Sequence, residues 1–230
     1  MNREKQCFSA ADRQVTLYRS AVADQPLIVL NTYSGDGSSV IEAMEEIGAP
    51  DCNFLVVGEL KWDRDMTPWY CPPLTENGTP YTGGAAEYLE VLLSEILPRA
   101  KKNIDGTPAF VGIAGYSLAG LFALYAMYRC DAFDRAASIS GSLWFPDFRE
   151  YATEREMMKR PEKLYISLGD KEANTRNQYL KTVRKNTETL VKHYKRLGLD
   201  VTWELTPGSH FKNPALRSAK GIKAILEQEK

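Results

Sequence analysis

The segment 109–129 constrains the fold of this 230-residue chain more than any other part of it. Residues 109–114 form a short apolar run typical of a buried strand, and 117–129 form an apolar stretch of helical length. Between them the chain reads Gly-Tyr-Ser-Leu-Ala-Gly, at 115–120. A strand, a sharp turn and a helix in this order predict a nucleophile elbow with Ser117 on its strained turn. The flanking positions must be small, and they are Gly115 and Ala119.

The rest of the chain alternates between short apolar runs and longer helical patterns. The apolar runs predict buried strands at 26–30, 53–57, 135–139 and 163–168, and 201–205 has the alternation of an edge strand. The helical patterns lie at 38–47, 85–102, 174–197 and 214–227. This order predicts a mostly parallel sheet with helices on both faces, built as one α/β domain over 1–230. A Rossmann or flavodoxin-like sheet is disfavoured, because 34–37 lacks the glycine spacing of a dinucleotide loop.

A serine hydroxyl becomes a useful nucleophile when an imidazole accepts its proton, and the chain holds two histidines. His193 stands in the middle of a predicted helix among lysines and arginines, where a solvated surface role is expected. His210 lies in the loop between the strand 201–205 and the last helix, which is where an α/β-hydrolase carries its base. We therefore expect His210 to activate Ser117.

An α/β-hydrolase triad also needs a carboxylate between the serine and the histidine in chain order. The strand 163–168 is followed at once by Gly169, Asp170, Lys171 and Glu172. Asp170 and Glu172 could each accept the imidazole Nδ1–H and fix the useful tautomer. The residues alone leave this choice open.

Two backbone amides are expected to stabilise the oxyanion. The Leu118 amide opens the helix after the elbow, where the free N–H groups and the positive end of the helix dipole point at the reacting carbonyl. The second donor comes from the loop after 27–31, at Thr32 or Tyr33, and we favour Tyr33. Aromatic side chains near the predicted pocket are expected to hold an acyl or aryl group, unless they pack the core: Trp62, Trp69, Tyr116 and Trp144.

Composition excludes several classes of function. A net charge of -1 gives no attraction to nucleic acid, and no stretch has the length and apolarity of a membrane span. The first 14 residues lack the apolar core of a signal peptide, so we expect a cytoplasmic protein. Four scattered cysteines without CxxC spacing predict free thiols. Neither a cofactor nor a metal is expected, and the oligomeric state stays open.

Several segments resemble the esterase D family of α/β-hydrolases, which includes feruloyl esterases and siderophore esterases. Arg-Asp-Met-Thr-Pro at 64–68 is similar to a family loop, and Ser-Gly-Ser-Leu-Trp-Phe at 140–145 is similar to a stretch of the siderophore-hydrolase-like members. The glycine pair 83–84 also precedes a helix ending Glu-Ile-Leu-Pro at 95–98, as in the family. The resemblance runs from about residue 25 to the C-terminus.

The resemblance implies that Glu172 is the acid, because the family commonly places it three residues after the glycine that closes its strand, here Gly169. The sequence departs from the family pattern at two places. The usual His-Gly after the oxyanion strand is Asn31-Thr32, and the N-terminal β extension is expected to be shortened to about 14–19.

Together these observations predict a serine hydrolase. It would cleave a carboxylic ester or thioester of a small molecule through an acyl-enzyme on Ser117, with His210 as general base and Glu172 as the orienting acid. Two alternatives are an acyltransferase that uses the same triad and a non-catalytic binding protein that has kept the fold.

Overall fold

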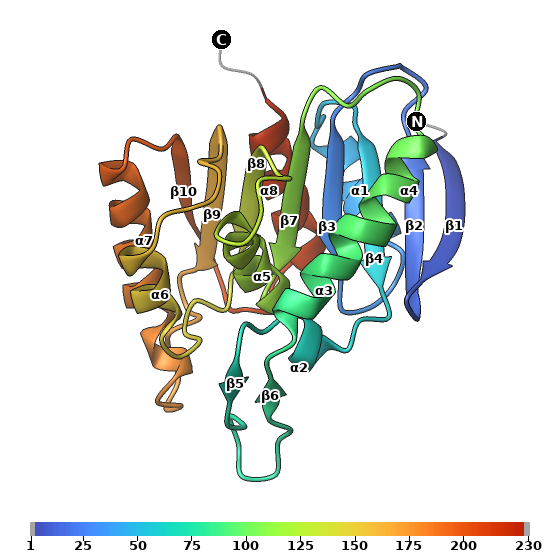
Figure 1. Ribbon diagram of the computed structural model, residues 1–230. Coiled ribbons are helices and arrows are strands. Elements are labelled where there is room, and N and C mark those ends of the chain that lie inside the picture. The colour runs from blue at the N-terminus through green and yellow to red at the C-terminus, as the bar shows by residue number, and fades with distance from the viewer. Residues whose placement is uncertain (1–2, 228–230) are drawn as a thin grey trace.

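The computed structural model describes residues 3–227 and is built on an eight-stranded sheet (Figure 1). In spatial order the strands are β1 (Glu4–Ala10), β2 (Arg13–Arg19), β4 (Asn53–Gly58), β3 (Leu27–Asn31), β7 (Val111–Tyr116), β8 (Arg135–Ile139), β9 (Lys163–Gly169) and β10 (Val201–Thr206). From β4 to β10 all neighbours are parallel, and the β1–β2 hairpin joins β4 antiparallel. The predicted α/β-hydrolase fold, with a mostly parallel sheet, is confirmed.

Helices cover both faces of this sheet, as Figure 1 shows. On one face lie α1 (Ser38–Glu46) and α8 (Pro214–Leu226), and on the other lie α3 (Ala85–Val91), α4 (Leu97–Lys102), α5 (Leu118–Met127), α6 (Phe148–Glu154) and α7 (Val183–Arg196). Strand β3 is buried along its whole length for this reason. Its side chains alternate, so that Leu27 and Val29 enter one core and Ile28 and Leu30 enter the other.

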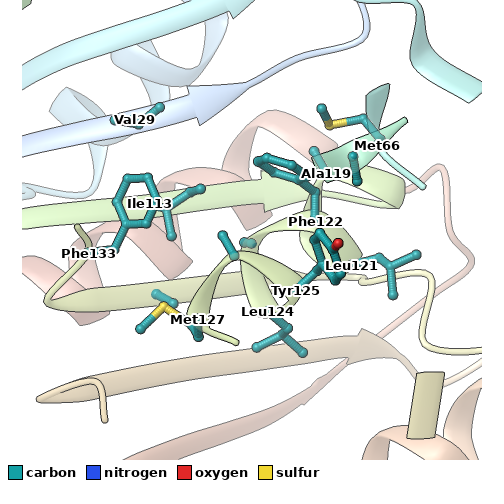
Figure 2. Close-up of a cluster of buried hydrophobic side chains, with 14 of the residues drawn as sticks. Val29, Met66, Ile113, Ala119, Leu121, Phe122, Leu124, Tyr125, Met127 and Phe133 are labelled. Carbon is teal, nitrogen blue, oxygen red and sulfur yellow. The ribbon is translucent and has the colours of Figure 1, made fainter. Parts of the chain in front are cut away.

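Helix α5 is buried on every side, which explains its apolar sequence. Figure 2 shows its side chains, among them Phe122 and Met127, packed with Ile113 of β7 and with Val29 of β3. The first turn of α5 follows the predicted elbow directly. The elbow is therefore anchored at both ends, by a central strand and by a fully buried helix.

The N-terminal β extension is longer than the sequence indicated. The strand expected at 14–19 is β2, but β1 precedes it and pairs with it from Glu4↔Arg19 to Ala10↔Arg13. Strand β1 is an edge strand whose residues are exposed or half-buried, so its sequence is largely polar. Because the ladder of backbone hydrogen bonds holds it, apolar patterning does not reveal it.

Three helical segments differ from the expected pattern. The predicted helix 174–197 begins with a 3-10 turn at Leu180–Thr182, because Asn177 Oδ1 accepts bonds from the Tyr179 and Leu180 amides. The run 85–102 contains a π-helix, Leu92–Ile96, just before Pro98, whose missing N–H removes one α-helical bond. Helix α6 was not predicted, because only Phe148 and Ala152 of its short sequence are buried.

The long segment 61–84 is structured. It contains α2 (Trp62–Asp65) and a two-stranded hairpin, β5 (Tyr70–Cys71) and β6 (Tyr81–Thr82), which projects below the sheet in Figure 1. The predicted free thiols are confirmed for all four cysteines. Within residues 3–227, no helix has the length and apolar character needed to cross a bilayer.

Candidate active site

Ser117 occupies a strained backbone conformation between β7 and α5. Its φ of 62° and ψ of −123° lie outside the regions that an L-residue ordinarily adopts. Hydrogen bonds hold it there: its amide donates to the Ile139 carbonyl over 3.1 Å, and its carbonyl accepts from the Gly120 amide over 3.0 Å. A Cβ on Gly115 would lie 2.2 Å from the Ala119 carbonyl oxygen, so only glycine fits before this turn.

His210 reaches the serine from the loop that follows β10. Its Nε2 lies 3.0 Å from Ser117 Oγ, and about 29% of its side chain is exposed. The Tyr116 hydroxyl donates to the His210 carbonyl, which ties this loop to the end of β7. Asp170 stabilises the same loop, because its Oδ1 accepts a hydrogen bond from the Gly208 amide over 2.7 Å.

Glu172, and not Asp170, faces the imidazole. Its Oε2 lies 2.7 Å from His210 Nδ1, and its side chain is only 4% exposed. The turn after β9 brings it there, since Oε1 accepts from the Gly169 amide over 2.6 Å while the Glu172 amide donates to the Gly169 carbonyl over 3.1 Å. The structure thus brings Ser117, His210 and Glu172 into one hydrogen-bonded line.

Burial and hydrogen bonding act in opposite directions on the Glu172 carboxyl. Burial raises its pKa, but the hydrogen bond and charge interaction with His210, the Gly169 amide and the Ser140 hydroxyl together hold the pKa below its usual range. The carboxylate is therefore ionised at neutral pH. An ionised acceptor at Nδ1 keeps the Nδ1–H tautomer and leaves Nε2 free to accept the serine proton.

Arg217 of α8 is a site residue that sequence reasoning missed. Its side chain is 5% exposed, and Nη1 lies 3.2 Å from Glu172 Oε1, 3.0 Å from Ser140 Oγ and 3.3 Å from the Tyr116 hydroxyl. Its Nη2 donates to the Pro207 carbonyl over 3.2 Å. Arg217 thus contacts each of the three segments that hold Ser117, His210 and Glu172. No local signal distinguishes it from the surface arginines of a helix.

Two backbone amides of residues that line the cavities beside Ser117 have no acceptor among the described residues. Within the described part of the chain, no group accepts a hydrogen bond from the Leu118 or Tyr33 amide, whereas the Thr32 amide donates to the Val57 carbonyl over 3.0 Å. This leaves Tyr33 available where Thr32 is occupied. Tyr33 is 71% exposed, and its ring meets the Trp62 ring edge-on, with 5.4 Å between centroids.

Two cavities meet at Ser117 and His210. The smaller, of about 280 Å³, extends towards the β5–β6 hairpin and α7 between Leu74, Tyr81, Trp144, Leu180 and Val183. The larger, of about 430 Å³, extends towards α1 and α8 between Tyr33, Val40, Tyr116, Pro214 and Ala215. Trp62 and Phe211 line both, and Phe211, which is 87% exposed, was missed because a single aromatic after the histidine carries no pattern.

Of the four aromatic residues expected at the pocket, Trp62, Tyr116 and Trp144 line the two cavities and Trp69 lines neither. The Trp69 indole donates to the Pro146 carbonyl over 3.0 Å, and its ring packs against Phe145 and Tyr151. It belongs to neither cavity lining and anchors the base of the hairpin. Ser142, inside the 140–145 motif, lies with its Oγ 3.4 Å from Ser117 Oγ.

Comparison with known proteins identifies the family and similar folds. The chain is similar to the uncharacterized protein YbbA of Bacillus subtilis (strain 168), with 23% identity over 177 residues that span 72% of this chain and 71% of YbbA. Among solved structures it is similar in fold to an IroE-like serine hydrolase from Shewanella oneidensis, with a TM-score of 0.77, 17% identity and coverage of 96% of this chain and 79% of that one.

Two further structures are similar in fold. The siderophore hydrolase EstA from Aspergillus nidulans has a TM-score of 0.74 at 18% identity, covering 96% of this chain and 93% of its own. The enterobactin hydrolase IroE, in a complex with DFP, has a TM-score of 0.70 at 17% identity, covering 98% and 95%. The model of the Esterase family, described as "Putative esterase", matches residues 40–197. The chain therefore belongs to the Esterase family and is a carboxylic ester hydrolase.

Proposed function

We propose that this protein is a serine hydrolase that cleaves a small-molecule carboxylic ester or thioester through an acyl-enzyme on Ser117. The observation that carries the proposal is the unbroken line from Glu172 Oε2 to His210 Nδ1, at 2.7 Å, and from His210 Nε2 to Ser117 Oγ, at 3.0 Å. The strained backbone of Ser117 supports it, because such strain is typical of an exposed nucleophile on an elbow.

In the first half of the reaction, His210 Nε2 accepts the hydroxyl proton while Ser117 Oγ bonds to the ester carbonyl carbon. The negative charge that develops on the carbonyl oxygen accepts hydrogen bonds from the Leu118 and Tyr33 amides. His210 then returns the proton to the departing alkoxide or thiolate, and the bond from the carbonyl carbon to the leaving group breaks. Glu172 stabilises the imidazolium that exists between these two proton transfers.

In the second half, His210 takes a proton from water, and the resulting oxygen nucleophile attacks the acyl-enzyme. As the second tetrahedral intermediate collapses, the bond to Ser117 Oγ breaks, His210 returns its proton to Oγ, and the acid is released. The two cavities at Ser117 give the acyl part and the leaving group separate places. Because similar structures include siderophore and enterobactin hydrolases, siderophore esters belong in the first substrate panel.

Steady-state and burst kinetics test this proposal. With a p-nitrophenyl ester, the wild-type protein should release a burst of p-nitrophenol that matches the enzyme concentration, and Ser117→Ala and His210→Ala should abolish it. Matched ester and thioester substrates then separate the two leaving groups. Adding an acceptor alcohol distinguishes hydrolysis from acyl transfer, since an acyltransferase would give more transesterified product than free acid.

A further inference from the structure

The smaller cavity contains one carboxylate that the proposed reaction does not use, that of Asp63. Two lining residues of this cavity are acidic, Asp63 and Glu172, and its described lining includes no lysine or arginine. Glu172 is occupied by His210 and Arg217, at 2.7 and 3.2 Å. The chain as a whole is balanced, with 29 basic and 30 acidic residues, so the negative sign of the cavity is a local property.

Asp63 is held in a fixed position. It belongs to α2, whose Asp65 is fully buried and pairs with Arg13 over 2.7 Å. The Thr79 hydroxyl donates to Asp63 Oδ2 over 3.0 Å, and among the described residues nothing donates to its Oδ1. The neighbouring cation, Arg64, contacts Asp65 and not Asp63. The Asp63 charge is therefore placed at the cavity and is not neutralised by an ion pair.

Aromatic residues line the same cavity as this charge. Trp62, Tyr81, Trp144 and Phe211 line the same cavity, and the Tyr81 and Trp144 rings meet edge-on with centroids 5.8 Å apart. Burial first, and the charge of Asp63 second, raise the pKa of Tyr81 to about 12, so Tyr81 stays a neutral phenol beside the carboxylate. A carboxylate among aromatic faces is the environment that attracts an ammonium group, through Coulomb and cation–π interactions.

The larger cavity has a different character. Its described lining contains neither acidic residues nor lysine or arginine, and it includes the apolar side chains of Val40, Pro214 and Ala215. The two cavities join at Ser117, where the ester carbonyl must lie. A substrate that spans them would place a positively charged part beside Asp63 and an uncharged part beside α1 and α8.

We propose that this enzyme selects esters in which one side of the ester bond carries an ammonium group, and that Asp63 determines this specificity. The proposal rests on the proposed hydrolysis at Ser117 and adds the charge of the substrate to it. Arg217 offsets the charge of Glu172, but the lining contains no lysine or arginine to offset the charge of Asp63, so anionic esters would be repelled by Asp63. They should be the poorest substrates.

A matched pair of esters tests the proposal. A choline ester and a 3,3-dimethylbutyl ester of the same acid have nearly the same shape and differ in the charge of the terminal group. We expect kcat/KM to be about 5- to 20-fold higher for the choline ester in low-salt buffer. In Asp63→Asn this ratio should fall to about 1. Glu76→Gln, which removes an exposed carboxylate of the same segment outside the cavity lining, should keep the wild-type ratio.

A labelling experiment gives the same information without turnover of either ester. Choline and 3,3-dimethylbutanol are compared as protectants of Ser117 against a fluorophosphonate probe, and choline should protect at a lower concentration in the wild-type protein but not in Asp63→Asn. Equal protection by the two alcohols, or a ratio unchanged by Asp63→Asn, would overturn the proposal. Absence of labelling at Ser117 altogether would instead count against the proposed function.

Discussion

Replacing Glu172 by glutamine tests the proposed relay most selectively, because it changes one atom and keeps the size of the side chain. Oε1 accepts hydrogen bonds from the Gly169 amide and from Arg217, so the amide oxygen of the new residue must keep that place. Its NH2 group then faces His210 Nδ1, which can accept that hydrogen bond only without a proton. The imidazole proton moves to Nε2 and points at Ser117.

An imidazole in that tautomer cannot accept the serine proton. Substitution of a triad carboxylate by its amide lowers kcat by about 10⁴-fold in a well-studied serine protease, which corresponds to about 5.5 kcal/mol of transition-state stabilisation. We expect a loss of about 10³- to 10⁴-fold in kcat for Glu172→Gln. Because the amide keeps the contacts with Gly169 and Arg217, KM and the fold should change little.

The matched control is Asp170→Asn. Asp170 carries the same charge two residues away, but its carboxylate accepts from the Gly208 amide and has no contact with His210. We expect at least a tenth of wild-type kcat. The assay is steady-state hydrolysis of a p-nitrophenyl ester, with circular dichroism to verify that both variants fold. A larger loss for Asp170→Asn than for Glu172→Gln would refute the reasoning.

Three further predictions concern the residues around this line. Gly115→Ala should destabilise the fold by about 1–3 kcal/mol, because its Cβ would lie 2.2 Å from the Ala119 carbonyl oxygen. It should also lower the labelling of Ser117 by a fluorophosphonate probe. An unchanged Tm in thermal unfolding would contradict this. Arg217→Met should cost about 3–5 kcal/mol of stability, because it leaves Glu172 buried without its cation. Arg217→Lys should retain more stability and more kcat than Arg217→Met. If urea unfolding and kinetics show equal losses for the two variants, the charge of Arg217 has no such role. The pKa of the Glu172 carboxyl is lower than its ordinary value of 4.5, so its contribution to stability is present at neutral pH and is lost as the pH falls below 4.5. In that range Tm should fall less steeply with pH for Glu172→Gln than for wild type. Parallel curves of Tm against pH would contradict the lowered pKa.

The sequence reveals Ser117 and His210 because each lies where a strand ends, and strand ends are readable from apolar runs. The elbow adds a steric requirement, small residues at 115 and 119, that is visible as letters. The choice between Asp170 and Glu172 is of another kind, because both follow the same strand. It depends on the turn in which the Gly169 amide bonds the Glu172 carboxylate, and apolar patterning does not reveal that turn. Only the family resemblance, with its acid three residues after the glycine that closes the strand, favoured Glu172.

Long-range contacts account for what the sequence could not predict. Arg217 lies 45 residues from Glu172 and 101 from Tyr116, and only the packing of α8 against the sheet brings them together. The sequence does not distinguish Trp69 from Trp144. In the structure the Trp69 indole donates to the Pro146 carbonyl, whereas Trp144 lines the smaller cavity. Strand β1 could not be predicted from apolar patterning, because an edge strand with little burial needs few apolar residues.

The central claim is that Ser117 is a nucleophile activated by His210. Reaction of the purified protein with a fluorophosphonate probe, followed by peptide mass spectrometry, tests it most directly, with Ser117→Ala and His210→Ala in parallel. The account predicts one adduct, on Ser117, that is absent from Ser117→Ala and formed far more slowly in His210→Ala. No adduct under conditions that label a known serine hydrolase, or an adduct on Ser117 that forms equally fast without His210, would contradict it.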